Sequence, residues 1–146
     1  MTLDAIQAHF DGVRQRIKLQ ASDSTITDPA EAFFTRSHQV QYSYNFTWLD
    51  RPIIQYPQDI AAFQELVSCV RPDLILETGI AHGGSLVLSA SLLCLLDVME
   101  GLDPRKSSRK VVGVDIDIRP HNRKALDEHP LRFKMELIEG SSIDPD

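Results

Sequence analysis

The chain has 146 residues, 42% of them hydrophobic and 25% charged, which is the composition of one folded globular domain rather than a disordered segment. The net charge of −6 argues against general nucleic-acid binding, and no apolar run is long enough to cross a bilayer core of about 30 Å as a helix. Cys69 and Cys94 lie in apolar helical patterns without metal-ligand spacing, and we expect a protein of the reducing cytoplasm.

The first third of the chain predicts two helices and an aromatic loop. Apolar residues recur at steps of three and four over residues 3–19, which predicts an amphipathic helix. Asp28 followed by Pro29 is the start signal of a short second helix that ends near Ser37. Residues 39–58 hold the tryptophan and all three tyrosines, and we expect an ordered loop. Such side chains suit both packing over a sheet and lining a substrate mouth, of which packing is favoured.

The centre of the chain predicts a strand, a glycine turn and a helix. After a helix over residues 58–70, the unbroken apolar run at 74–76 suits a strand of a parallel sheet that is covered on both faces. Glu77 stands at the end of this strand, glycines follow, and Ser85 is well placed to cap an apolar helix that runs to Met99. In an open α/β sheet, ligands bind at such a junction.

The last third predicts two further strands, over residues 110–117 and 133–138, with a short helix between them. Right-handed crossovers make this the first half of a doubly wound, Rossmann-like α/β sheet with spatial strand order 3-2-1. We therefore expect a helical and aromatic-loop extension over residues 1–56 and the N-terminal half of a Rossmann-like domain over residues 57–146.

The spacing of the glycines distinguishes between cofactors. A dinucleotide fingerprint reads G-x-G-x-x-G with an acid about 20 residues further on. Here the pattern is Gly79-x-x-x-Gly83-Gly84, and the next acid at a strand end is Asp115, which can accept hydrogen bonds from ribose hydroxyls. The acid of Glu77-Thr-Gly79 instead resembles the first motif of class I S-adenosylmethionine-dependent methyltransferases, whose cofactor carries an ammonium group. Two alternatives stay open: a nicotinamide dinucleotide site, and a turn that only permits tight helix packing.

Six motifs follow one another between residues 40 and 146. They are Tyr44–Trp48, Arg51–Ile54, Pro57–Asp59, Glu77–Ser85, Gly113–Asn122 and Glu139–Asp144. In order and spacing they resemble the cephalosporin hydroxylase and rhamnosyl O-methyltransferase family. The resemblance implies an S-adenosylmethionine-binding domain that acts on a hydroxyl of a sugar, glycolipid or antibiotic-like small molecule. The reaction would be O-methyl transfer or the hydroxylase-type role for which part of the family is named.

The resemblance also implies roles for individual residues. By position, the methionine part of the cofactor would be surrounded by Glu77, Gly79, Ala81, His82, Gly83 and Ser85. Asp115 would hold the ribose, and Ser142 would lie near the adenine. Each has a structural alternative: His82 as a turn residue bonded to the backbone, Asp115 as a helix cap, and Ser142 as part of a polar strand exit.

Members of that family continue past the point where this chain ends, with segments that include a magnesium site. The resemblance therefore implies that the metal ligands, the general base and much of the acceptor pocket lie outside these residues, so we name no catalytic residue and no metal ligand. Whether the chain is itself an enzyme stays open, and a non-catalytic truncated product is an alternative. Because the first strand would lack one neighbour, we expect homo-oligomers or dependence on a missing C-terminal segment.

Overall fold

The structure is a computed structural model that describes residues 3–143. Its contacts divide the chain into two compact units, one up to Tyr42 and one from Ser43 onward, and each unit is described by itself. Among the described residues, no helix is both long and apolar enough to span a membrane.

The first unit contains two helices. Helix α1 (Leu3–Gln20) confirms the predicted amphipathic helix. Helix α2 (Ser24–Gln39) begins earlier than predicted, because its N-cap is Asp23, whose side chain accepts a hydrogen bond of 2.9 Å from the N–H of Thr25. The predicted start at Asp28 is therefore wrong. Pro29 lies inside the helix, where it removes one backbone donor.

A 3₁₀ turn (Tyr42–Asn45) begins at the last residue of the first unit and continues into the second. It is followed by an antiparallel hairpin of strands β1 (Phe46–Trp48) and β2 (Arg51–Ile53). The predicted ordered loop is thus wrong over this stretch. The hairpin turns at Leu49 and Asp50, whose φ angles are 43° and 65°. Positive φ at both central residues is the geometry that best fits the twist of a two-residue hairpin. The sequence does not predict this turn, because leucine is uncommon at a position with positive φ.

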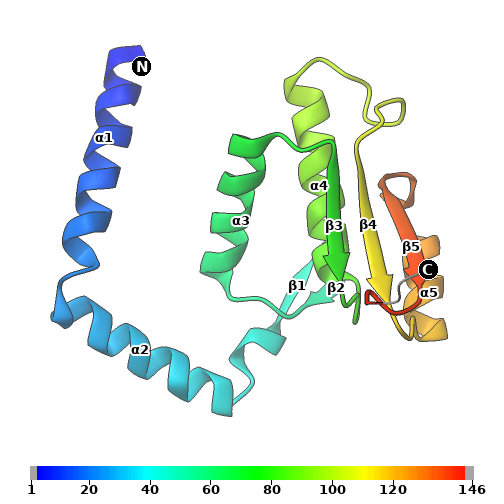
Figure 1. Ribbon diagram of the computed structural model, residues 1–146, viewed down its shortest axis with the longest axis horizontal. Helices are drawn as coiled ribbons and strands as arrows, with labels where there is room; N and C mark the ends of the chain where they lie inside the picture. The colour runs from blue at the N-terminus through cyan, green and yellow to red at the C-terminus, as the bar shows by residue number, and fades with distance from the viewer. Residues whose placement is uncertain (1–2, 144–146) are drawn as a thin grey trace. The chain divides into compact units, whose positions relative to one another are not determined.

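The main sheet confirms the predicted fold class. Strands β3 (Leu74–Thr78), β4 (Lys110–Asp115) and β5 (Met135–Glu139) are parallel and pair in the order β3-β4-β5, which is the spatial order 3-2-1 of a Rossmann-like half sheet. Helices α4 (Gly84–Met99) and α5 (Pro120–Asp127) connect them, and α3 (Pro57–Val70) precedes β3. All three arrows point the same way in Figure 1, so the turns that follow them meet at one edge.

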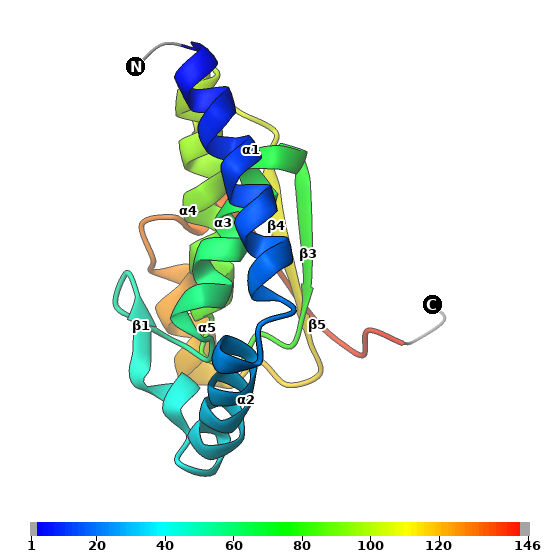
Figure 2. The same ribbon diagram turned by 90° about the vertical axis from the view of Figure 1, so that its left-hand side faces the viewer.

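Helices α3, α4 and α5 all lie on one side of this sheet (Figure 2), and α4 supplies half of the buried hydrophobic residues in the core of the described chain. The first strand is therefore not covered on both faces, as we predicted, since Leu74 and Leu76 are 58% and 64% exposed. The physical reason is the topology. Two right-handed crossovers that advance in the same direction across a sheet place both of their helices on the same face.

A buried ionic cluster joins α4 to the beginnings of β4 and β5. The carboxylate of Asp97 in α4 is fully buried and accepts hydrogen bonds from Lys134 (2.6 Å), Arg109 (3.0 Å) and Ser107 (2.8 Å). Lys134 is itself only 1% exposed. Burial alone would raise the pKa of Asp97, but these three hydrogen bonds outweigh it and hold that pKa below its ordinary value. Asp97 is therefore ionised and is paired with both Lys134 and Arg109.

Candidate functional site

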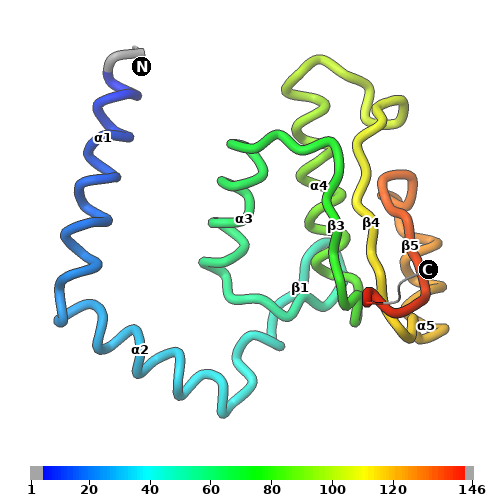
Figure 3. Tube along the Cα trace, viewed as in Figure 1, coloured from blue at the N-terminus to red at the C-terminus, as the bar shows by residue number. Residues whose placement is uncertain are grey.

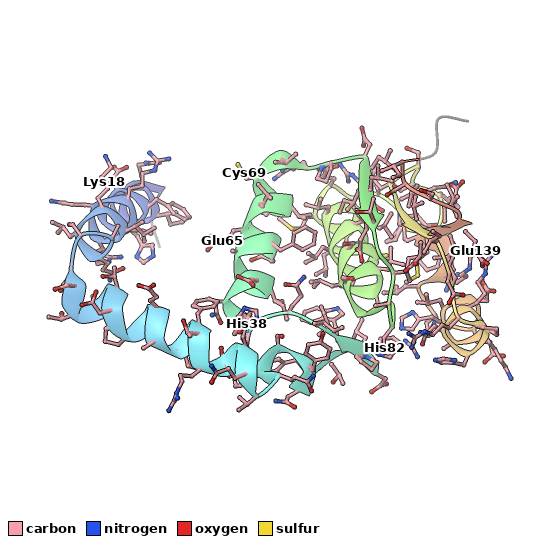
Figure 4. The ribbon with its side chains drawn as sticks, turned by 60° about the horizontal axis from the view of Figure 1, so that its bottom comes forward. Lys18, His38, Glu65, Cys69, His82 and Glu139 are labelled. Atoms are coloured by element: carbon pink, nitrogen blue, oxygen red, sulfur yellow. The ribbon has the colours of Figure 1, made fainter. Side chains whose placement is uncertain are left out.

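A cavity of about 600 Å³ lies at the turn between β3 and α4, at the carboxyl edge of the sheet. Figure 3 shows how the trace reverses there, and His82 is labelled on this turn in Figure 4. Six of the eight predicted site residues line the cavity: Glu77, Gly79, Ala81, His82, Gly83 and Ser85. The volume is in the range of small-molecule sites, which is roughly 300–1,000 Å³.

The backbone of the turn requires its unusual residues. Gly79 and Gly83 have φ angles of 84° and 82°, and Ala81 between them has a φ of 47°. Gly83 is the N-cap of α4 in this left-handed conformation, so the prediction that Ser85 caps the helix is wrong. Gly84 follows, and a Cβ there would lie 2.2 Å from the carbonyl oxygen of Pro52 in β2. The helix start and the hairpin backbone are therefore in direct contact.

Ser85 has another partner, because its hydroxyl donates a short hydrogen bond to the carboxylate of Glu77. Glu77 is half-buried at the end of β3. Burial raises the pKa of Glu77, and the hydrogen bond from Ser85 offsets part of that rise. A carboxylate that has lost part of its hydration in a cavity wall favours the binding of a cationic group.

Asp115 lies behind the turn and is not part of the cavity lining. Its Oδ2 accepts hydrogen bonds from the N–H groups of Ile80 (2.6 Å) and Ala81 (3.3 Å), and its Oδ1 accepts one from Asp117 (3.2 Å). Burial alone would raise the pKa of Asp115, but these backbone donors hold it below the ordinary value. Asp115 is therefore an ionised carboxylate that holds the turn in place, whichever ligand the site takes.

Ser142, the last of the predicted residues, is exposed in the segment after β5 and lies outside the cavity lining. That segment begins beside Asp115, because the N–H of Gly140 donates to the Asp115 carbonyl oxygen at 2.8 Å. The ends of β4 and β5 are thus adjacent, although Ser142 is not brought together with the six residues of the cavity.

Sequence reasoning missed two residues that contact the turn. Arg51 in β2 donates to the His82 carbonyl oxygen, at 2.9 Å from Nε, and to the side chain of Asn122 at 3.0 Å. Asn122 in α5 donates in turn to the Ala81 carbonyl oxygen at 2.8 Å. Both residues belong to motifs that carry the family resemblance, but no local pattern in the chain indicates their role.

The cavity also extends beyond the turn. Gln55 and Asp59 contribute polar groups to its wall, and apolar side chains from α3, β3 and α4 complete it: Ile60, Phe63, Ile75 and Leu88. Of the two roles considered for the aromatic side chains of residues 39–58, the favoured packing role is confirmed for Trp48, and none of these aromatic side chains lines the cavity. Trp48 packs on the core and donates from Nε1 to the Ser91 hydroxyl at 3.1 Å, whereas Gln55 faces the cavity.

Within residues 3–143, no group of three or more His, Cys, Asp and Glu side chains is arranged to hold a metal ion. The polar groups that line the cavity include the carboxylates of Glu77 and Asp59, which accept hydrogen bonds, and the first turn of α4, whose N–H groups donate them. They can bind a cationic group and an anionic group side by side, because a helix N-terminus favours negative charge.

Comparison with known proteins finds a matching family and three matching chains of solved structures, two of which are described below. The model of the family described as rhamnosyl O-methyltransferase/CmcI matches residues 40–146. The structure named "cmcI-N160 SAH" is 21% identical with a TM-score of 0.45, and the match covers 66% of this chain and 43% of that one. "CmcI-N160 apo-structure" is 22% identical with a TM-score of 0.47, covering 69% and 38%. This chain thus spans less than half the length of either structure, and no curated protein matches it.

Proposed function

We propose, since this chain belongs to the rhamnosyl O-methyltransferase/CmcI family, that it binds S-adenosylmethionine and supplies the cofactor-binding part of an O-methyltransferase. The observation that carries the proposal is the position of Glu77 in the wall of a cavity at the β3–α4 turn. In this proposal the binding half-domain comprises residues 57–146, and the preceding β1–β2 hairpin packs against α4.

The residues present fit this cofactor by their chemistry. S-adenosylmethionine carries an ammonium and a sulfonium cation, a carboxylate, a ribose and an adenine. Glu77, with its raised pKa, regains favourable electrostatics when a cation binds beside it. The first turn of α4 offers backbone N–H groups to the carboxylate end of the methionine part.

Asp115 is proposed to hold the ribose. This role requires acceptor positions on a carboxylate that already accepts hydrogen bonds from the backbone N–H groups of the turn. An ionised carboxylate has about four acceptor positions, and the backbone N–H groups of Ile80, Ala81, Ile116 and Asp117 already donate to this one. A ribose hydroxyl would therefore share an acceptor position with one of these donors or replace it. Gly79, Ala81, His82 and Gly83 bring the backbone close to the methionine part, and Ser142 is proposed to approach the adenine from the end of β5.

When bound, S-adenosylmethionine supplies an activated methyl group. The residues named here bind and orient it, so that an acceptor oxygen can be held in line with the methyl and sulfur atoms. We propose that the acceptor is a hydroxyl of a sugar, glycolipid or antibiotic-like small molecule, and the word rhamnosyl in the family description supports the sugar among these. None of these residues is assigned as the general base that removes the hydroxyl proton.

Isothermal titration of S-adenosylhomocysteine and of NAD⁺ into the protein tests the cofactor. We expect saturable binding of S-adenosylhomocysteine and weaker or undetectable binding of NAD⁺. Glu77→Gln should weaken binding about 10- to 100-fold, as the loss of a charge-assisted contact does. The matched control is Glu65→Gln, because Glu65 lies on α3 on the side away from the sheet (Figure 4). Tighter binding of NAD⁺, or no binding of S-adenosylhomocysteine, would refute the proposal.

A further inference from the structure

We propose that Arg51 and Asn122 form a clamp that positions the glycine turn for cofactor binding, and that the β1–β2 hairpin is therefore a working part of the site. This inference rests on the proposed function, because it assigns to both residues an effect on cofactor affinity. Neither residue lines the cavity, so both are positioning residues that act through the backbone of residues 81 and 82.

The two residues of the clamp come from distant parts of the chain and bind the carbonyl groups of two consecutive residues, Ala81 and His82. The guanidinium of Arg51 donates to the His82 carbonyl oxygen from both Nε and Nη2, and Nη2 also reaches Oδ1 of Asn122 at 3.0 Å. Asn122 is 3% exposed and uses its amide nitrogen on the Ala81 carbonyl oxygen at 2.8 Å. Arg51 can only donate, which sets the orientation of the Asn122 amide. Both polar atoms of that amide are therefore hydrogen-bonded, the oxygen to Arg51 and the nitrogen to Ala81.

The turn needs such support because its conformation is unfavourable for its residues. Ala81 has a φ of 47°, and a non-glycine residue persists in this region only where the surroundings determine it. Asp115 holds the N–H groups of Ile80 and Ala81, and the clamp holds the carbonyls of Ala81 and His82. Strands β2 and β4 and helix α5 thus fix the turn together. Helix α4 begins directly after it, so the clamp also fixes the direction of the free N–H groups at that helix start.

The hairpin that carries Arg51 is itself firmly seated on α4. The backbone of Pro52 lies against Gly84 so closely that no Cβ could be accommodated, and Trp48 donates to Ser91 in the middle of α4 at 3.1 Å. Arg51 pairs with Trp48 in the hairpin register. These contacts hold the Arg51 backbone in a constant position relative to the turn, which is what a clamp requires.

Two conservative variants separate positioning from general stability. Arg51→Lys keeps the charge but lacks the planar fork. Asn122→Asp keeps an acceptor for Arg51 but places a carboxylate oxygen against the Ala81 carbonyl oxygen, so it removes that hydrogen bond and adds a repulsion between two acceptors. The matched control is Arg71→Lys, because Arg71 pairs with Glu100 at a partly exposed site outside the cavity lining. Each protein is measured without ligand by amide hydrogen exchange, and its S-adenosylhomocysteine affinity and thermal melting are measured in parallel.

We expect both variants to exchange the amides of residues 80–83 about 5- to 10-fold faster than the unaltered protein, as the loss of one hydrogen bond predicts. Exchange in β4 and the melting temperature should be the same as in the control. The affinity for S-adenosylhomocysteine should fall by a similar factor, and the double variant should be no worse than the weaker-binding single variant, because both residues act on one turn.

Unchanged exchange at the turn, or a uniform increase over the whole sheet with a lower melting temperature, would overturn the clamp. Equal affinity of the unaltered protein and both variants for S-adenosylhomocysteine would overturn it as well, and would leave the proposed function standing. Absence of binding in every form, the unaltered protein included, would refute the proposed function. The exchange rates of the amides of residues 80–83 would then be the only test of whether Arg51 and Asn122 hold the turn.

Discussion

Replacement of Asp97 by asparagine should destabilise the protein strongly, although Asp97 lies in the ionic cluster rather than at the cavity. The change removes the charge that pairs with Lys134 at 2.6 Å and with Arg109 at 3.0 Å. Arg109 keeps a second carboxylate, since its Nη2 lies 2.7 Å from Glu100. Lys134, at 1% exposure, is left buried with no carboxylate beside its ammonium among the described residues.

The loss of unfolding free energy can be estimated from the buried ammonium of Lys134, which has lost its carboxylate partner. Removal of one partner from a buried ion pair costs about 3–5 kcal/mol, because the other charge stays desolvated. Domains of this size have unfolding free energies of about 5–15 kcal/mol, so the variant should lose a large part of its stability. Urea unfolding followed by circular dichroism measures the difference as a shift of the midpoint.

The matched control is Asp103→Asn. Asp103 faces Lys106 at 3.8 Å, and both side chains are largely exposed, so the control should cost at most about 1 kcal/mol. The pKa of Asp97 is depressed in the folded state, so its contribution is present above the pKa of the unfolded chain and is lost as pH falls through the folded pKa. The difference between Asp97→Asn and the unaltered protein should therefore shrink in acid. Equal costs of the two substitutions at neutral pH would refute the assignment of the cluster.

Four further predictions concern the site and the sheet edge. Gly84→Ala should destabilise the protein by about 1–3 kcal/mol in the same urea experiment, because its Cβ would meet the backbone of Pro52 at 2.2 Å; an unchanged midpoint would mean that the hairpin can move away. Asp115→Ala should weaken S-adenosylhomocysteine binding by about 1.5–3 kcal/mol in a titration and Asp117→Ala by less, and equal effects would show that the ribose is misplaced. Because burial raises the pKa of Glu77, its ionised form is lost at a higher pH than in a free side chain, so affinity should begin to fall at a higher pH than the titration of an ordinary glutamate predicts, with a flatter profile for Glu77→Gln. Strand β3 is an edge of the described sheet, so the isolated chain should self-associate in sedimentation experiments at micromolar concentration, and a stable monomer would contradict this.

Local patterns in the sequence were sufficient for the fold class. The apolar runs that form β3, β4 and β5, the helical periods between them and the glycines of the turn are properties of neighbouring residues. Together with right-handed crossovers they determine the parallel order that the structure shows. The motifs of residues 40–146 were also sufficient to indicate the family that the comparison finds.

Only the tertiary structure decided which side chains meet at the turn. Ser85 follows a glycine turn and reads as a helix cap, but the cap is Gly83 and the Ser85 hydroxyl turns to Glu77 on the preceding strand. Arg51 and Asn122 are 71 residues apart, and nothing in the neighbourhood of either predicts that they share the backbone of one turn. Periodicity and capping depend on contacts within a few positions along the chain. A contact between a hairpin, a turn and a later helix depends instead on how the elements pack.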